Sequence, residues 1–114
     1  MPYLKIQPNL PLTEKAEHSI LKSASSLVAS ELGKPEEFVM IAVQPNTPMM
    51  FGGSDDPVAF LELKSIALPG AKTKQLSQAL CQLIKEQLGI PMERVYVKFI
   101  DVKRGMWGWK GDTF

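Results

Sequence analysis

The strongest constraint on the fold is an internal repeat. Residues 32–39 read LGKPEEFV, and residues 88–95, which begin 56 positions later, read LGIPMERV. The same offset also aligns two apolar stripes. The first consists of Ile20, Ala24, Leu27 and Val28, and the second of Leu76, Leu80, Leu83 and Ile84. Self-similarity at a fixed spacing indicates one structural unit used twice. The sequence therefore predicts one domain over residues 1–114, built from copies at residues 2–57 and 58–114.

Each copy contains the pattern of an amphipathic helix. In the first copy, apolar residues recur with a period of about 3.6, Thr13 can cap the start and Gly33 can close the end. In the second copy the same pattern leads to Gly89. A proline two residues beyond each glycine prevents the helix from continuing. These signals predict helices over residues 14–32 and 73–88.

Segments rich in β-branched and aromatic residues flank both predicted helices and indicate strands. They cover residues 3–7, 38–43, 58–68 and 95–101. The order of elements is then β-α-β twice, and the crossover in such a unit is right-handed almost without exception. Two units side by side predict an α+β fold, a four-stranded sheet with both helices on one face.

The other face of this sheet is predicted to lack a cover within the chain. Its apolar side chains would be Phe38, Met40, Ala42, Phe60 and Tyr96. A soluble monomer rarely exposes so much contiguous apolar surface. We therefore expect copies of the chain to associate over this face.

Composition excludes several classes of function. Thirteen basic and 12 acidic residues leave a net charge of +1, so no overall field attracts nucleic acid or an anionic membrane. No run approaches the roughly 18 apolar residues of a spanning helix, and residues 1–10 do not resemble a signal peptide, which favours the cytoplasm.

Cys81 and His18 are each the only residue of their type, which excludes an intrachain disulfide, a cysteine metal cluster and a two-histidine zinc site. We expect Cys81 to pack as a small hydrophobe and His18 to face solvent.

Pro2 is a candidate catalytic base. Removal of Met1 would convert its nitrogen from an amide into a rigid secondary amine, which can titrate near neutral pH when it is desolvated. Many chains begin Met-Pro without any chemical role, so the dipeptide alone leaves both interpretations open. Lys34 precedes the strand predicted beside Pro2, and a cation there would favour the neutral, basic amine. Alternatively, the positive charge of Lys34 could serve only to offset the partial negative charge at the C-terminus of the first helix.

Both tryptophans of the chain lie in its glycine-rich end. Trp107 and Trp109 stand within residues 105–114, which finish at Phe114. Aromatic side chains on such a segment need burial, and they could stack on a planar ligand or lock subunits together. The sequence leaves both alternatives open.

Six short motifs in a fixed order resemble the macrophage migration inhibitory factor family, which includes D-dopachrome tautomerase. They are Met1-Pro2, Gly33-Lys34-Pro35, Phe51-Gly52-Gly53-Ser54, Lys64-Ser65-Ile66, Arg94-Val95-Tyr96-Val97, and the ending from Gly108-Trp109 to Thr113-Phe114. The resemblance spans essentially the whole chain. It implies the tautomerase fold in a homotrimer, with three active sites at subunit boundaries.

The same resemblance implies a function and a set of site residues. Pro2, freed of Met1, would act as general base in the keto–enol tautomerisation of phenylpyruvate-like 2-oxo acids and of dopachrome-like artificial substrates. No metal or organic cofactor would be required. Lys34 matches the family lysine that binds the substrate carboxylate. The other implied site residues are Ile66 for a backbone contact, Tyr96 from the neighbouring subunit, Trp109 and Phe114 as pocket walls, and Phe38, where the family often has tyrosine.

Three departures from the pattern concern substrate preference and redox chemistry. Lys98 stands where relatives of the mammalian cytokine carry asparagine, which adds a cation near the implied site. Trp107 replaces a smaller aliphatic residue and would narrow the mouth of the pocket. Residues 58–61 replace a Cys-x-x-Cys motif, so a thiol oxidoreductase activity is not expected.

Two other functions remain open at this stage. The chain could be a cytokine-like protein that binds a partner or receptor and retains a vestigial pocket, and family members can be secreted without a signal peptide. Two β-α-β units with an open sheet face also describe small-molecule-sensing modules. A tautomerase needs the free Pro2 amine, whereas neither alternative does.

Overall fold

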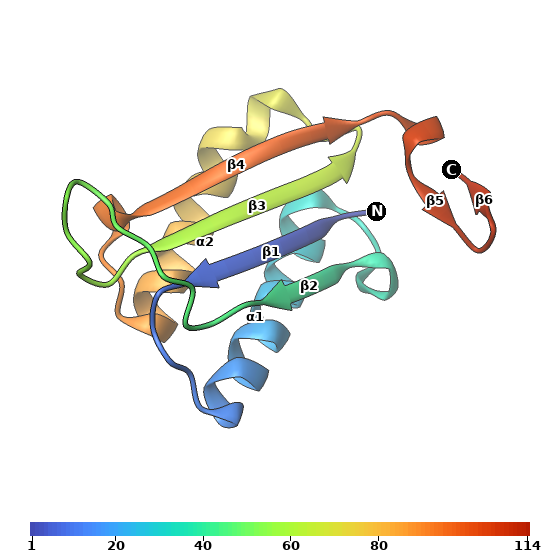
Figure 1. Cartoon of the computed structure of the whole chain (residues 1–114). Coiled ribbons are helices and arrows are strands. Elements are labelled where there is room, and N and C mark those ends of the chain that lie inside the picture. Colours follow the sequence, from blue (N-terminus) through green and yellow to red (C-terminus); the bar gives the residue numbers. More distant parts are fainter.

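The computed structural model describes residues 1–114. Most of the chain lies in a four-stranded sheet and in two helices that pack on it (Figure 1). A small two-stranded ribbon follows at the C-terminus. The strands are β1 (Tyr3–Pro8), β2 (Met40–Val43), β3 (Ala59–Ile66), β4 (Val95–Val102), β5 (Gly108–Trp109) and β6 (Asp112–Thr113). The α-helices are α1 (Glu14–Leu32) and α2 (Thr73–Leu88), and the 3-10 turns are η1 (Glu36–Phe38), η2 (Gly70–Lys72), η3 (Met92–Arg94) and η4 (Arg104–Met106).

The main sheet has the strand order β2-β1-β3-β4. β1 and β2 are parallel, β3 and β4 are parallel, and the central pair β1 and β3 is antiparallel. Each β-α-β unit therefore supplies one parallel pair, and the two units meet where Leu4 lies opposite Leu63. This arrangement confirms the predicted α+β fold.

Both helices cover the same face of the sheet (Figure 1). Side chains alternate along each strand, so one set points to the helices and the other points away. The core between sheet and helices contains Leu4, Ile6, Leu61 and Leu63 from the strands, Ile20, Ala24 and Val28 from α1, and Leu76, Leu80 and Ile84 from α2. Burial of each large aliphatic side chain contributes roughly 1.5–3 kcal/mol, and this layer holds the two units together.

Local capping sets the helix ends, which agree with the prediction. The Thr13 side chain accepts a hydrogen bond from the Ala16 amide at 3.1 Å. Gly33 and Gly89 adopt left-handed conformations with φ of 62° and 69°. Glycine carries no Cβ, so it ends each helix there without strain. Cys81 is buried and His18 is exposed, as predicted.

Two predicted strands were too long. The segment 38–43 begins its strand only at Met40, because residues 36–38 form η1 after Pro35. The segment 58–68 pairs only between Ala59 and Ile66, because Ala67 turns the chain with a φ of 53°. Composition identified these strands, but turns at their ends shortened them.

The sheet face without helices is open within one chain, and Met40 and Tyr96 are 65% and 61% exposed there. The prediction for this face was wrong in one detail, because Phe38 lies in η1 and not on the sheet. A charged row crosses the face where Lys5, Glu62 and Lys98 are paired across three strands. The face therefore combines exposed apolar side chains with a row of charges across its middle.

The loop between the two units is fixed by one arginine. Phe51 and Ser54 pair across a tight turn at Gly52 and Gly53. The Arg94 guanidinium donates hydrogen bonds to the carbonyls of Phe51, Ser54, Asp56 and Pro57 at 3.0–3.1 Å. It therefore joins the start of β4 to the whole loop.

We expect Arg94→Ala to lower the free energy of unfolding by about 2 kcal/mol, because charge-assisted hydrogen bonds contribute about 1.5–3 kcal/mol and their loss leaves carbonyls without donors. Arg94→Lys should retain only part of this stability, since an ammonium lacks the planar array of N–H donors of a guanidinium. Urea unfolding at one fixed protein concentration measures the difference, with the exposed Lys74→Ala as control. Equal midpoints for Arg94→Ala and Lys74→Ala would contradict the role of Arg94.

Candidate active site

Pro2 lies at the start of β1, fully buried against the helix side of the sheet. Its carbonyl accepts a hydrogen bond from the Met40 amide at 3.0 Å, which ties it to the start of β2. The turn η1 and the C-terminal ribbon both approach this end of the sheet (Figure 1). The N-terminus is therefore held in one place by backbone structure.

Lys34 is directed toward the same end by the turn that ends α1. After Gly33 reverses the chain, the Lys34 amide donates to the Ala29 carbonyl at 3.0 Å. The Lys34 ammonium then donates to the Ser65 hydroxyl at 2.9 Å and to the Ile66 carbonyl. These two acceptors at the end of β3 hold the half-buried cation in position.

The terminal amine lies within the field of this cation. In the chain with Met1 present, the pKa of the terminal amine is lowered from 8.0 to about 6. Burial is the largest cause, followed by the charge of Lys34 and a hydrogen bond with it, and then by the charge of Arg104. Each cause disfavours the protonated amine. The Met1 amine is therefore mostly neutral at physiological pH.

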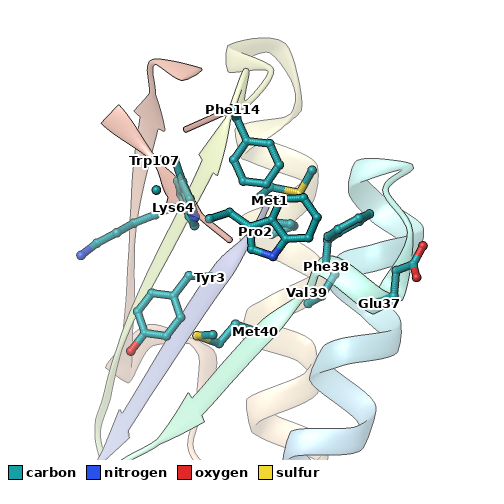
Figure 2. A pocket seen from close by; sticks show the side chains of 12 residues that line it. Met1, Pro2, Tyr3, Glu37, Phe38, Val39, Met40, Lys64, Trp107 and Phe114 are labelled. Atoms are coloured by element: carbon teal, nitrogen blue, oxygen red, sulfur yellow. The ribbon is translucent and has the colours of Figure 1, made fainter. Parts of the chain in front are cut away.

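Aromatic side chains form the other side of the site. A cavity of about 520 Å³ lies between η1, the start of β1 and the C-terminal ribbon. The Trp109 ring stacks on Phe114 with centroids 5.3 Å apart, and its edge contacts Phe38 at 5.4 Å. Figure 2 shows Phe38, Trp107 and Phe114 around Met1 and Pro2. Such a wall suits a planar apolar group.

A second cavity adjoins the first. Its volume is about 250 Å³, and its lining residues are Met1, Lys34, Pro35, Ile66, Arg104 and Phe114. Met1 and Phe114 line both cavities. The N-terminal residue thus lies between an aromatic compartment and a cationic one.

The structure brings together most of the residues that the sequence singled out. Pro2, Phe38, Trp107, Trp109 and Phe114 line the larger cavity. Lys34 and Ile66 line the smaller one. Residues from both halves of the repeat therefore meet at one end of the sheet.

Two of the singled-out residues lie elsewhere in the chain. Tyr96 is at the opposite end of the sheet, where its ring packs on Phe51 with centroids 4.7 Å apart. Lys98 is exposed in the middle of β4, paired with Glu62 across the open face. Within a single chain neither residue reaches the cavities around Pro2.

Sequence reasoning missed several residues of the site, among them the acidic Glu37, which lines the larger cavity. Tyr3, Met40 and Lys64 line the larger cavity, and Arg104 lines the smaller one. Alternation along β1 and β3 could have placed Tyr3 and Lys64 on one face, since they pair directly. Arg104 belongs to a basic pair just before the aromatic segment, but no local pattern pointed it toward Lys34.

No cluster of three or more histidine, cysteine, aspartate or glutamate side chains is arranged to hold a metal ion. The helices are also unsuited to crossing a lipid bilayer, since none combines the necessary length and apolar character. The side chains that line the two cavities include the cations Lys34, Lys64 and Arg104, the carboxylate of Glu37 and several aromatic rings.

Comparisons with known proteins agree with this fold. The sequence model for macrophage migration inhibitory factor (MIF) matches residues 1–114. A macrophage migration inhibitory factor homolog of Brugia malayi is 40% identical over 115 aligned positions, which cover 100% of this chain and 99% of the relative. The crystal structure of a homologue from Prochlorococcus marinus has a TM-score of 0.93 and 42% identity, with 98% of each chain covered. The Toxoplasma gondii protein has a TM-score of 0.92 and 32% identity, covering 98% of this chain and 99% of its own.

Two β-α-β units, one mixed sheet and a proline at the first strand define a protein of the tautomerase fold. Matches over the full length of the sequence and of the fold narrow this class further. The chain belongs to the macrophage migration inhibitory factor family.

Proposed function

We propose that the protein is a keto–enol tautomerase of phenylpyruvate-type 2-oxo acids, in which the Pro2 amine acts as general base after Met1 is removed. The supporting observation is the environment of the terminal nitrogen. Burial and the charges of Lys34 and Arg104 lower the pKa of the Met1 amine to about 6, and the same surroundings should lower the pKa of a Pro2 amine. A general base works best when its pKa lies near the working pH.

The reaction moves one proton from carbon to oxygen and shifts the double bond from C=O to C=C. The neutral Pro2 nitrogen accepts a proton from the carbon next to the keto group, and the electrons of that C–H bond form the C=C bond. The C=O electron pair moves to oxygen, which then takes the proton back from the Pro2 ammonium. Substrate and product are isomers, so no other reactant is consumed. Cations beside the developing negative charge on oxygen stabilise the transition state.

The two compartments match the two ends of this substrate. Lys34 offers a cation to the carboxylate, and its ammonium is already fixed by Ser65 and Ile66. The stacked pair Trp109 and Phe114 offers an apolar wall to the phenyl ring. A substrate that spans both compartments would present its reacting carbon to the nitrogen between them.

We also propose that the functional unit is a homotrimer with sites at subunit boundaries. Three observations support association: the sheet face without a helix cover, the exposure of Met40 and Tyr96, and an apolar cavity of about 200 Å³ beside Tyr96. A neighbouring chain placed over this face would supply Tyr96 and Lys98 to a site that lacks them in one chain. Light scattering of the Met-free protein tests this assembly.

The function is tested by a phenylpyruvate tautomerase assay on protein whose mass shows that Met1 is absent. Pro2→Gly should reduce kcat/KM at least about tenfold, because glycine keeps an amine but loses the rigid ring and the secondary nitrogen. An unchanged rate for Pro2→Gly would refute catalysis by Pro2. It would then favour a partner-binding protein with a vestigial pocket.

A further inference from the structure

The smaller cavity contains a second cation that the family resemblance did not supply. Arg104 opens η4, directly after β4 ends at Val102. The backbone around it is fixed, since the Trp107 amide donates to the Arg104 carbonyl at 3.2 Å and the Met106 amide donates to the Lys103 carbonyl at 2.9 Å. This turn places Arg104 in the lining of the cavity that also contains Lys34.

Two cationic side chains therefore share one compartment that no acidic side chain lines. Both Lys34 and Arg104 also act on the terminal amine, because the charge of each lowers its pKa. A cavity of this kind favours a ligand that brings the missing negative charge.

The hydrogen bonds of Lys34 show why one cation is insufficient. An ammonium has three N–H groups, and two of those on Lys34 already donate to Ser65 and Ile66. The third interacts with the Met1 amine and becomes free for a ligand when Met1 is removed, whereas a carboxylate has two oxygens and about four acceptor sites. A guanidinium can donate to the remaining acceptor sites, since its planar pair of N–H groups matches the two oxygens of a carboxylate.

We propose that Arg104 is a second carboxylate-binding residue, which together with Lys34 holds the carboxylate of a 2-oxo acid and so selects anionic over neutral substrates. This inference rests on the proposed tautomerase function and extends it to the basis of substrate preference. Lys34 is the fixed cation, and the exposed Arg104 closes on the carboxylate from the solvent side.

The test compares a charged and a neutral substrate on Met-free protein. For phenylpyruvate, Arg104→Ala should raise KM about tenfold, because a charge-assisted pair is lost. For the methyl ester of phenylpyruvate, KM should stay within about twofold, since no carboxylate is present. Arg104→Lys should recover part of the loss. Equal changes for acid and ester would overturn the proposal.

Lys103→Ala is the matched control, because it removes one exposed positive charge from the neighbouring position. It should leave both KM values unchanged within about twofold, as expected of a screened surface charge. If Lys103→Ala raised KM for phenylpyruvate as much as Arg104→Ala does, the effect would come from the overall positive charge of this region. That result would overturn the proposal.

A binding measurement separates this inference from the proposed activity. The non-reactive acid 3-phenylpropanoate should change the fluorescence of Trp107 and Trp109, which line the adjoining cavity. Arg104→Ala should weaken its binding about tenfold, while binding of 3-phenylpropanamide should not change. Absence of turnover with this pattern intact would refute only the proposed reaction. Equal binding of the acid by wild type and Arg104→Ala would refute the role of Arg104.

Discussion

Protein that retains Met1 is expected to convert phenylpyruvate about 10²–10⁴ times more slowly than Met-free protein, the range by which a positioned general base accelerates a reaction. With Met1 attached, the Pro2 nitrogen is an amide whose lone pair is delocalised into the peptide bond. Met1 also lines both cavities and stands between them. Its removal would free a basic nitrogen and the space beside it.

An insertion variant isolates the chemical cause. Alanine placed between Met1 and Pro2 leaves an Ala-Pro terminus after processing, so the ring remains while the Pro2 nitrogen stays an amide. Intact mass defines each terminus, and circular dichroism checks that the fold is unchanged. Turnover by the Ala-Pro form at the Met-free rate would disprove the role of the Pro2 amine.

The Met-free protein should also show a defined pH dependence. The neutral amine is the active form, so kcat/KM should rise with pH through the pKa of Pro2 and then level off. The surroundings that lower the pKa of the Met1 amine to about 6 should act on Pro2 in the same direction. Activity should therefore persist at pH values where an ordinary terminal amine is protonated.

Lys34→Met is expected to reduce kcat/KM for phenylpyruvate about 10²–10³-fold, comparable to the loss of one donor to a developing oxyanion. Methionine retains an apolar stem of similar length but offers no charge and no hydrogen bond. The loss removes the cation that Ser65 and Ile66 hold in place. Both substrate binding and stabilisation of the enolate should therefore be weaker in this variant.

The terminal amine gives a second readout for Lys34. In the Met1-retaining protein, Lys34→Met should raise the amine pKa from about 6, but not fully to 8.0, because burial remains and is the largest cause of the shift. Nuclear magnetic resonance titration of the labelled terminus measures this change. Lys22→Met, on the exposed side of α1, should change neither the pKa nor the rate. An unaltered amine pKa in Lys34→Met would contradict the proposed contact.

Features that depend on neighbouring residues were predictable from the sequence. Both ends of α1 follow from Thr13 and Gly33, and the end of α2 follows from Gly89, because the effects of these residues act within one helical turn. The strand ends were less predictable. Met40 begins β2 because Pro35 is followed by a 3-10 turn, and composition alone does not reveal such a turn.

The site depended on contacts between distant parts of the chain. The motif around Lys34 suggested a cation, but only the packed structure shows its ammonium on Ser65 and Ile66. The aromatic residues at the C-terminus could have served a ligand or a neighbouring subunit. In the structure Trp109 packs against Phe38 and Phe114, so the segment folds back on the chain's own turn η1.

By itself the sequence determined the repeated β-α-β unit, the ends of the helices and the presence of a proline at position 2, because periodicity, caps and order along the chain are local properties. The tertiary structure alone decided that Arg104 joins Lys34 and that Tyr96 and Lys98 do not reach Pro2 within one chain. The turn η4 brings Arg104 to Lys34, and the sheet register keeps Tyr96 and Lys98 away from Pro2. These residues are far apart in sequence, and the free energy of packing the whole core sets that geometry.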